Sequence, residues 1–78
     1  MKTTKYFEFR RLLSDRKGIR DEWIEKVVKN PDRREVQEDG RIRMWGAVDS
    51  AEGRYIRVVV LEDGVTVHNV FFDRSYKG

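Results

Sequence analysis

The chain contains no cysteine, so neither a disulfide framework nor a thiolate nucleophile or metal ligand is available to it. A single histidine excludes a site built on a histidine pair. The longest apolar run, Val58–Leu61, is far shorter than the ~20 residues that a membrane-spanning helix requires. Because no apolar segment of the signal-peptide kind follows Met1–Lys5, the expected location is the cytoplasm, with no membrane partner.

The sequence has 78 residues, which predicts one domain over residues 1–78. Charged residues make up 40% of the chain and hydrophobic residues 38%. A domain near this size buries only roughly 60% of the surface of its unfolded chain. We therefore expect a small core beneath a heavily charged surface.

Positive charge is only slightly in excess, since 17 Lys and Arg face 14 Asp and Glu for a net charge of +3. The excess is spread along the chain and forms no basic tail. Arginine is the preferred cation, however, with 11 Arg against 6 Lys. Its planar guanidinium pairs with phosphate and stacks on bases, which favours a nucleic-acid or carboxylate partner. The alternative is a solvated surface of internal ion pairs, because nucleic-acid modules usually carry a larger basic excess.

One amphipathic helix is predicted from about Arg20 to Lys29, because apolar residues recur there at helical spacing. Asn30 and Pro31 end it. Ahead of it, Lys5–Arg10 fits either a short strand or a first helical turn, and residues 11–18 fit a loop or a frayed helix. The stripe consists of Ile19, Trp23, Ile24, Val27 and Val28.

After Pro31, apolar residues recur at every second position, which predicts strands. Turns at Asp39–Gly40, Asp49–Gly53 and Glu62–Gly64 separate the alternating runs. The strands are expected at 33–38, 41–48, 54–61 and 65–73. The fold class is therefore α+β, with one main helix followed by a four-stranded antiparallel meander.

Turn geometry predicts the register. A three-residue loop ending at Gly40 pairs Val36 with Ile42 and keeps apolar side chains on one face. One helix covers only one face, so the other should be partly open. The same loop at Glu62–Gly64 predicts how the last two strands divide their side chains between the two faces of the sheet. One face carries Ile56, Val58, Val60, His68, Val70 and Phe72. The opposite face carries Tyr55, Arg57, Val59, Val67, Asn69 and Phe71.

Two sets of residues carry candidate chemistry. His68 alone titrates near neutrality, and it is either a general acid or base or a hydrogen-bonded structural residue. Arginine and aromatic side chains alternate on the strands, as single-stranded RNA binding requires, although a solvated face with Trp45 in the core fits equally well. Asp73, Arg74 and Tyr76, which follow the last strand, could reach the mouth of a cleft or belong to a frayed end. The RNA-binding and phosphate-binding candidates are Arg41, Arg43, Trp45, Arg57 and Arg74.

Other site signatures are missing from the sequence. It contains no phosphate-binding glycine loop, no paired-carboxylate motif and no metal-ligand spacing. Gly40, Gly53 and Gly64 are expected in turns. We therefore expect neither a cofactor nor a metal.

Several segments follow one another in a recognisable order: Asp15–Ile19, the helix 21–30 with Pro31, Gln37–Arg43, Tyr55–Val58 and the closing strand Val67–Arg74. This order, over residues 5–74, is similar to that in a bacterial family of small domains of unknown function related to RelE-type toxins.

This resemblance implies a barnase/RelE-like fold, in which one or two helices precede an antiparallel sheet. It also implies a toxin-like protein that cleaves messenger RNA without metal and is paired with a small antitoxin protein. Carried over to this chain, the catalytic positions are Arg57 and His68, with Arg43 as a phosphate contact. Related domains commonly carry a histidine in the N-terminal segment, and this chain has Phe7 at the corresponding place. The alternative is therefore a protein-interaction module that has lost the catalytic residues.

Overall fold

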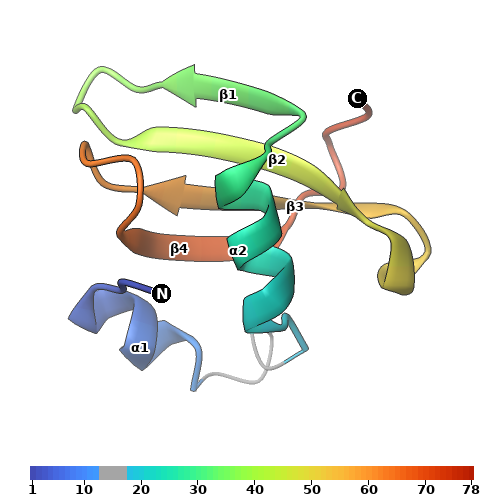
Figure 1. The fold of residues 1–78 in the computed structure, drawn as a ribbon, viewed down its shortest axis with the longest axis horizontal. Coiled ribbons are helices and arrows are strands. Elements are labelled where there is room, and N and C mark those ends of the chain that lie inside the picture. Colours follow the sequence, from blue (N-terminus) through green and yellow to red (C-terminus); the bar gives the residue numbers. More distant parts are fainter. Residues whose placement is uncertain (13–17) are drawn as a thin grey trace.

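The computed structural model describes residues 1–12 and 18–78, and within them the chain forms two α-helices and one four-stranded antiparallel sheet. Figure 1 shows the strands in sequence order, which confirms the α+β class and the meander. Most of the segment 11–18 lies outside the described residues. The elements are α1 (Lys5–Arg10), α2 (Asp21–Lys29), β1 (Arg33–Val36), β2 (Ile42–Val48), the 3-10 helix η2 (Asp49–Ala51), β3 (Arg54–Val60) and β4 (Val67–Phe72).

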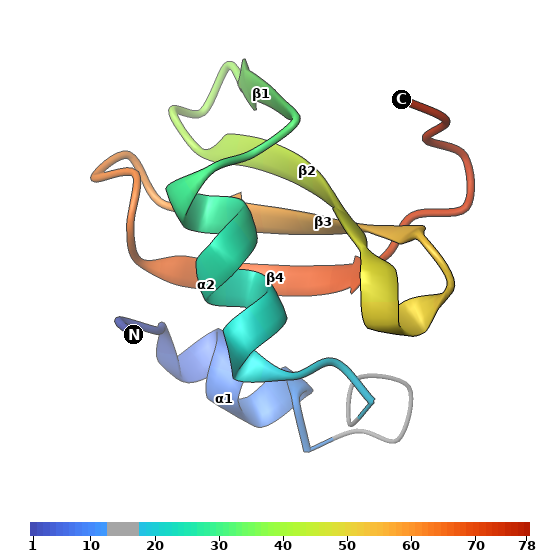
Figure 2. The ribbon, with the colours of Figure 1, turned by 45° about the vertical axis from the view of Figure 1, so that its right-hand side comes forward.

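The segment Lys5–Arg10 is a helix rather than a strand. Thr4 caps it, because its hydroxyl accepts a hydrogen bond from the backbone N–H of Phe7 at 3.0 Å. The residues before α1 pair with the outer edge of β4, where Thr4 N–H donates to the carbonyl of Val67 at 3.0 Å. Both views place α1 beside β4 (Figures 1 and 2). The N-terminal segment therefore covers an edge that would otherwise be free to pair.

Helix α2 crosses one face of the sheet (Figures 1 and 2). It begins at Asp21 and ends at Lys29, as the sequence predicts, and its buried residues Ile24 and Val27 contact the sheet. Acidic residues in the first turn and lysines in the last suit the helix dipole. Burial of this apolar stripe holds α2 on the sheet.

The register of the first hairpin is the predicted one, since Val36 pairs with Ile42. The second hairpin differs from the prediction at one point. Val60 pairs with Val67 and Val59 with Asn69, so His68 is the extra residue of a β-bulge. The prediction that Val67 lies on the open face is wrong, because its side chain is 0% exposed in the core beneath the helices.

Without the bulge, His68 would lie opposite Val60 in the core row and Val67 would point to the other face of the sheet. Strand β4 therefore begins at Val67 rather than at Val65, and β1 ends at Val36 rather than at Glu38. His68, expected in the core row, lies instead at the edge of the sheet next to α1. The bulge therefore removes His68 from the core row of Ile56, Val58 and Val70, in which the sequence predicted it.

The side of the sheet opposite α2 is here called the far face, and no helix among the described elements packs on it. After β4 the chain returns across this side, and the ring of Tyr76 stacks on that of Trp45. The far face consists of Arg33 and Glu35 of β1, Arg43, Trp45 and Ala47 of β2, Tyr55, Arg57 and Val59 of β3, and Asn69 and Phe71 of β4.

Gly46 sets the closest approach of α2 to the sheet. A Cβ at this position would lie 2.6 Å from Cγ2 of Val27, so any side chain would push α2 outward. We expect Gly46→Ala to lower the free energy of unfolding by about 1–3 kcal/mol through overpacking. Urea denaturation followed by tryptophan fluorescence measures the change.

Gly18→Ala provides the matched control, because nothing lies within 4 Å of a Cβ at Gly18. We expect it to be neutral or slightly stabilising. Equal stability of the Gly46→Ala variant and the wild type would show that α2 does not pack at this distance.

Candidate nucleic-acid interface

Two of the predicted arginines share the far face. Arg57 pairs with Trp45 on one side and Phe71 on the other, and Arg43 lies in the next row with Val59. Diagonal neighbours in adjacent rows are about 7–8 Å apart, which is within reach of long side chains. The register therefore places Arg43 and Arg57 on one surface, as the sequence predicts.

Asp73 organises the centre of the far face. Its Oδ2 accepts a hydrogen bond from the indole N–H of Trp45 at 2.9 Å and lies 3.6 Å from Nε of Arg57. Its Oδ1 accepts from the backbone N–H and the hydroxyl of Ser75, at 3.1 and 2.6 Å. The hydrogen bonds from Ser75 and Trp45 lower the pKa of Asp73, although burial opposes them. The carboxylate therefore stays ionised and fixes both Trp45 and Arg57.

The ring of Trp45 is not available to a base. It is 5% exposed, because Tyr76 stacks on it at 5.2 Å between ring centroids. Tyr76 also meets the ring of Tyr55 edge to face, at 4.8 Å. The aromatic surface offered to a ligand is therefore made by Tyr55 and Tyr76, with Trp45 supporting them from beneath.

Arg57 is held over an aromatic ring. Its guanidinium carbon lies 4.3 Å from the centre of the Phe71 ring, and its side chain is partly exposed. Its Nε is buried and makes no hydrogen bond within the described part of the chain. Stacking on Phe71 and attraction to Asp73 thus fix the plane of the guanidinium, while its outer nitrogens remain the groups that could meet a phosphate.

His68 lies apart from this cluster. Its Nδ1 is 3.0 Å from the hydroxyl of Thr4, and its ring stacks on Tyr6 at 4.7 Å. Burial, and to a lesser extent the nearby charge of Arg41, lowers the pKa of His68. Three positions along a strand separate it from Phe71, the neighbour of Arg57, a distance of roughly 10 Å. The described contacts do not bring His68 and Arg57 together.

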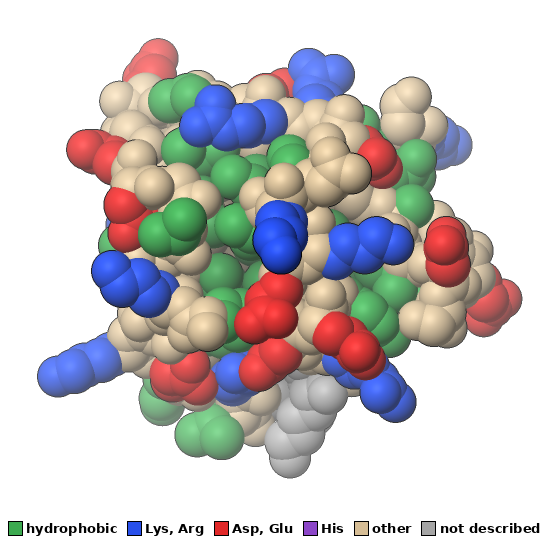
Figure 3. All heavy atoms as spheres, viewed as in Figure 1, with side chains coloured by type: hydrophobic (Ala, Val, Ile, Leu, Met, Phe, Trp, Pro, Cys, Tyr) green, Lys and Arg blue, Asp and Glu red, His purple; other side chains and the backbone are tan. Residues whose placement is uncertain are grey.

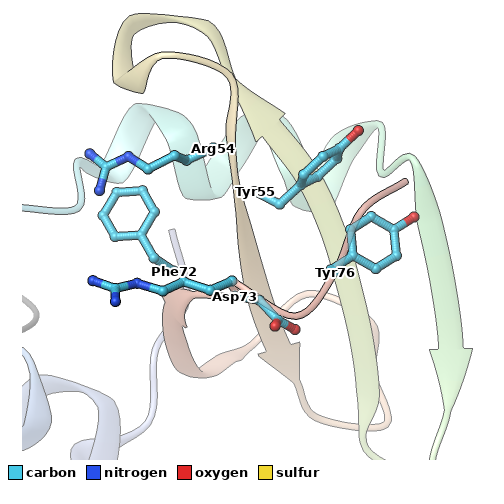
Figure 4. Close-up of a pocket in the computed structure, with 6 residues that line it drawn as sticks. Arg54, Tyr55, Phe72, Asp73 and Tyr76 are labelled. Carbon is cyan, nitrogen blue, oxygen red and sulfur yellow. The ribbon is translucent and has the colours of Figure 1, made fainter.

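Arg41 and Arg74 lie at opposite ends of the region. Arg41 precedes β2 and lies 3.8 Å from a carboxylate oxygen of Asp39. Arg74 follows β4 and lines a cleft of about 310 Å³ at the end of the sheet (Figure 4). The same cleft includes Arg54, a residue that the sequence analysis did not single out.

The opposite side of the molecule carries both signs of charge. In Figure 3, which looks onto α2, acidic and basic side chains alternate around small apolar areas. A surface of this kind offers no continuous field to a polyanion. The helix side is therefore a poor candidate for nucleic-acid binding.

Comparisons of this chain with protein-family models, with curated proteins and with solved structures give no match. None of the helices described is long and apolar enough to cross a bilayer. The described residues contain no group of three or more His, Cys, Asp or Glu placed to hold a metal ion.

Asp73 should make stability depend on pH. Because folding lowers its pKa, its contribution is present above the ordinary aspartate pKa of about 3.9 and is lost as the pH falls through the lower folded value. We expect Asp73→Asn to reduce the free energy of unfolding at pH 7 by about 1.5–3 kcal/mol, the range for hydrogen bonds to a charged group. Urea denaturation measures the difference in free energy of unfolding between the wild type and Asp73→Asn. We expect this difference to be smaller at pH 3 than at pH 7.

Asp63 is the control for this measurement. Hydrogen bonds from Thr66 and Val65 lower its pKa to about 2, but it is fully exposed and remote from Trp45. Asp63→Asn should therefore leave the fluorescence of Trp45 unchanged, whereas Asp73→Asn should alter it. If the free energies of unfolding of the wild type and Asp73→Asn differ by the same amount at pH 7 and pH 3, the ionised form of Asp73 is not the stabilising group.

Proposed function

We propose that this protein acts on single-stranded RNA, in the manner of a RelE-type domain, through the far face of its sheet. One observation supports this most strongly: Arg43 and Arg57 share a surface with the rings of Tyr55 and Tyr76. Bases stack on aromatic planes while guanidinium groups pair with phosphates. A sheet that carries both groups on one accessible side suits an unpaired strand.

The two arginines would contribute differently. Arg57 is oriented by Asp73 and Phe71, so little rotational freedom is lost when it binds a phosphate. Arg43 is more exposed, and its guanidinium lies 3.9 Å from a carboxylate oxygen of Glu35. Arg43 also donates to the side-chain oxygen of Gln37, and these surface contacts would be exchanged for a phosphate. Arg57 would therefore fix the register of the strand, and Arg43 would add affinity.

Cleavage of RNA, unlike binding, also needs a proton acceptor close to the cations. Without a metal, a base must take the proton of the ribose 2′-hydroxyl, and cations must stabilise the phosphate as it becomes pentacoordinate. The lowered pKa of His68 leaves its ring neutral at pH 7, which is the state that a base requires. Because His68 lies apart from Arg57, a substrate would have to follow β4 to meet both. The proposal therefore puts binding first and endoribonuclease activity second.

Binding is tested by fluorescence anisotropy with a labelled single-stranded RNA in the presence of a chelator. We expect the double variant Arg43→Gln, Arg57→Gln to weaken binding and to lower the slope of log affinity against log salt by about 1.4, since each lost contact removes about 0.7 for a single strand. Arg20→Gln, at the start of α2, should change neither quantity. An unchanged salt slope in the double variant would contradict the proposed interface.

Cleavage is tested on the same RNA by denaturing gel electrophoresis, again in chelator. If the chain is an endoribonuclease, His68→Ala and Arg57→Ala should each slow cleavage by about 10²-fold or more, as expected for loss of a proton acceptor or of a preorganised cation. RNA that stays intact with micromolar wild-type protein would remove the enzymatic part of the proposal and leave binding alone.

A second candidate function, a protein-interaction module, is favoured by the outer side of α1. Phe9 is 65% exposed and Leu12, just after the helix, is 71% exposed. With Tyr6 they form an apolar patch of the kind that often binds another protein, for which the resemblance implies a small antitoxin. Phe9→Ser would then abolish capture of the partner encoded beside this chain without changing RNA affinity, whereas an RNA-only domain would bind no such partner.

A further inference from the structure

The cleft at the end of the sheet has two different sides. It lies where β3 begins and β4 gives way to the C-terminal segment, and its volume is about 310 Å³. Figure 4 shows Arg54 and the ring of Phe72 on one side, with the rings of Tyr55 and Tyr76 on the other. Asp73 and Arg74 complete its lining. Phe72 packs toward α2 while Tyr55 belongs to the far face, so the cleft wraps around the end of the sheet, with Arg54 on its α2 side and the tyrosines on its far side.

Arg54 is fixed before any ligand arrives. Its Nε donates a hydrogen bond to the carbonyl of Ala51 at 3.1 Å, and its guanidinium carbon lies 4.2 Å from the centre of the Phe72 ring. Phe72 is in turn held by the ring of Trp23, edge to face at 6.4 Å. The terminal nitrogens of Arg54 therefore have a set direction and are the donors left for a ligand.

The two arginines of the cleft, like Arg34 on β1, have no ion pair among the described residues. Among the described residues, neither Arg54 nor Arg74 lies within salt-bridge distance of a carboxylate. Asp73, the carboxylate among the described lining residues, is engaged with Trp45, Ser75 and Arg57. By contrast, carboxylates lie close to Arg33, Arg41, Arg43 and Arg57.

Two uncompensated guanidinium groups at one cleft favour an anion with several acceptor oxygens. The volume lies at the small end of the ~300–1,000 Å³ typical of ligand pockets, which suits a single nucleotide. Tyr55 and Tyr76 line the cleft and also belong to the aromatic surface above Trp45. The tyrosine side of the cleft therefore belongs to the proposed RNA surface, and its arginine side lies around the end of the sheet.

We propose that this cleft binds a phosphate monoester carried by a nucleotide, and that in the cell this group is the phosphorylated end of the RNA strand. Arg54 and Arg74 bind the terminal phosphate, and the rest of the strand passes around the end of the sheet toward Tyr55 and Tyr76. The identity of the ligand rests on the proposed function, whereas the recognition of a phosphate monoester rests on the cleft alone. The site gives the interface a direction, because one end of the strand is anchored here.

The experiment compares one RNA sequence with a 5′-phosphate, with a 3′-phosphate, or with hydroxyl groups at both ends. We expect one phosphorylated form to bind about tenfold tighter than the hydroxyl form, a difference that two charge-assisted hydrogen bonds readily supply. Arg74→Gln, at an exposed position, should abolish the preference without affecting folding, and Arg54→Gln should do the same. Arg34→Gln, an exposed arginine on β1 at the other edge of the sheet, is the control and should keep it.

Adenosine monophosphate and adenosine, measured by calorimetry, form the second arm. Binding of the monophosphate but not of adenosine, lost in Arg74→Gln, supports the cleft. If RNA binds with no preference for a phosphorylated end and the monophosphate does not bind, this inference is overturned while the proposed function stands. If the monophosphate binds but RNA does not, the phosphate site stands and its assignment to an RNA end is overturned, together with the proposed function.

Discussion

The carboxylate of Asp73 is the interaction on which the rest of this surface depends. It binds the indole of Trp45 and lies beside Arg57, and through Ser75 it turns the C-terminal segment back across the sheet. That turn places Tyr76 on Trp45 and closes one side of the cleft. A single buried charge therefore positions a cation, an aromatic platform and a pocket, because each hydrogen bond it accepts fixes a different segment.

This arrangement requires that the helices leave the far face free. Both α1 and α2 bury their apolar residues on the same core, α2 across the sheet and α1 along β4. Gly46 lets α2 approach closely, so one short helix suffices to cover the core row. In a chain of 78 residues the available apolar surface is used on one side, and charged and aromatic residues occupy the other.

Local signals predicted the parts of the fold that local forces determine. The stripe of α2, the Asp-Gly turns and the pairing of Val36 with Ile42 all follow from residues near one another in sequence. Contacts between distant segments decide the rest: backbone pairing of Lys2 and Thr4 with Val67 holds the helix 5–10 against β4, and burial of Val67 accompanies the bulge at His68. Arg43 and Arg57 were placed on one face by alternation alone, whereas Asp73 and Arg54 acquire their importance only from partners that the chain brings to them.

The most direct test of the account is a two-dimensional NMR titration of the labelled protein with a short single-stranded RNA at low salt. We predict that the shifted signals come from the far face and the C-terminal segment, with the indole N–H of Trp45 and the amides of Arg57, Asn69 and Tyr76 among the largest changes. The signals of α2 should not move. Shifts concentrated on α1 and α2, or no shifts at all at millimolar RNA, would contradict the assignment of the far face as a nucleic-acid interface.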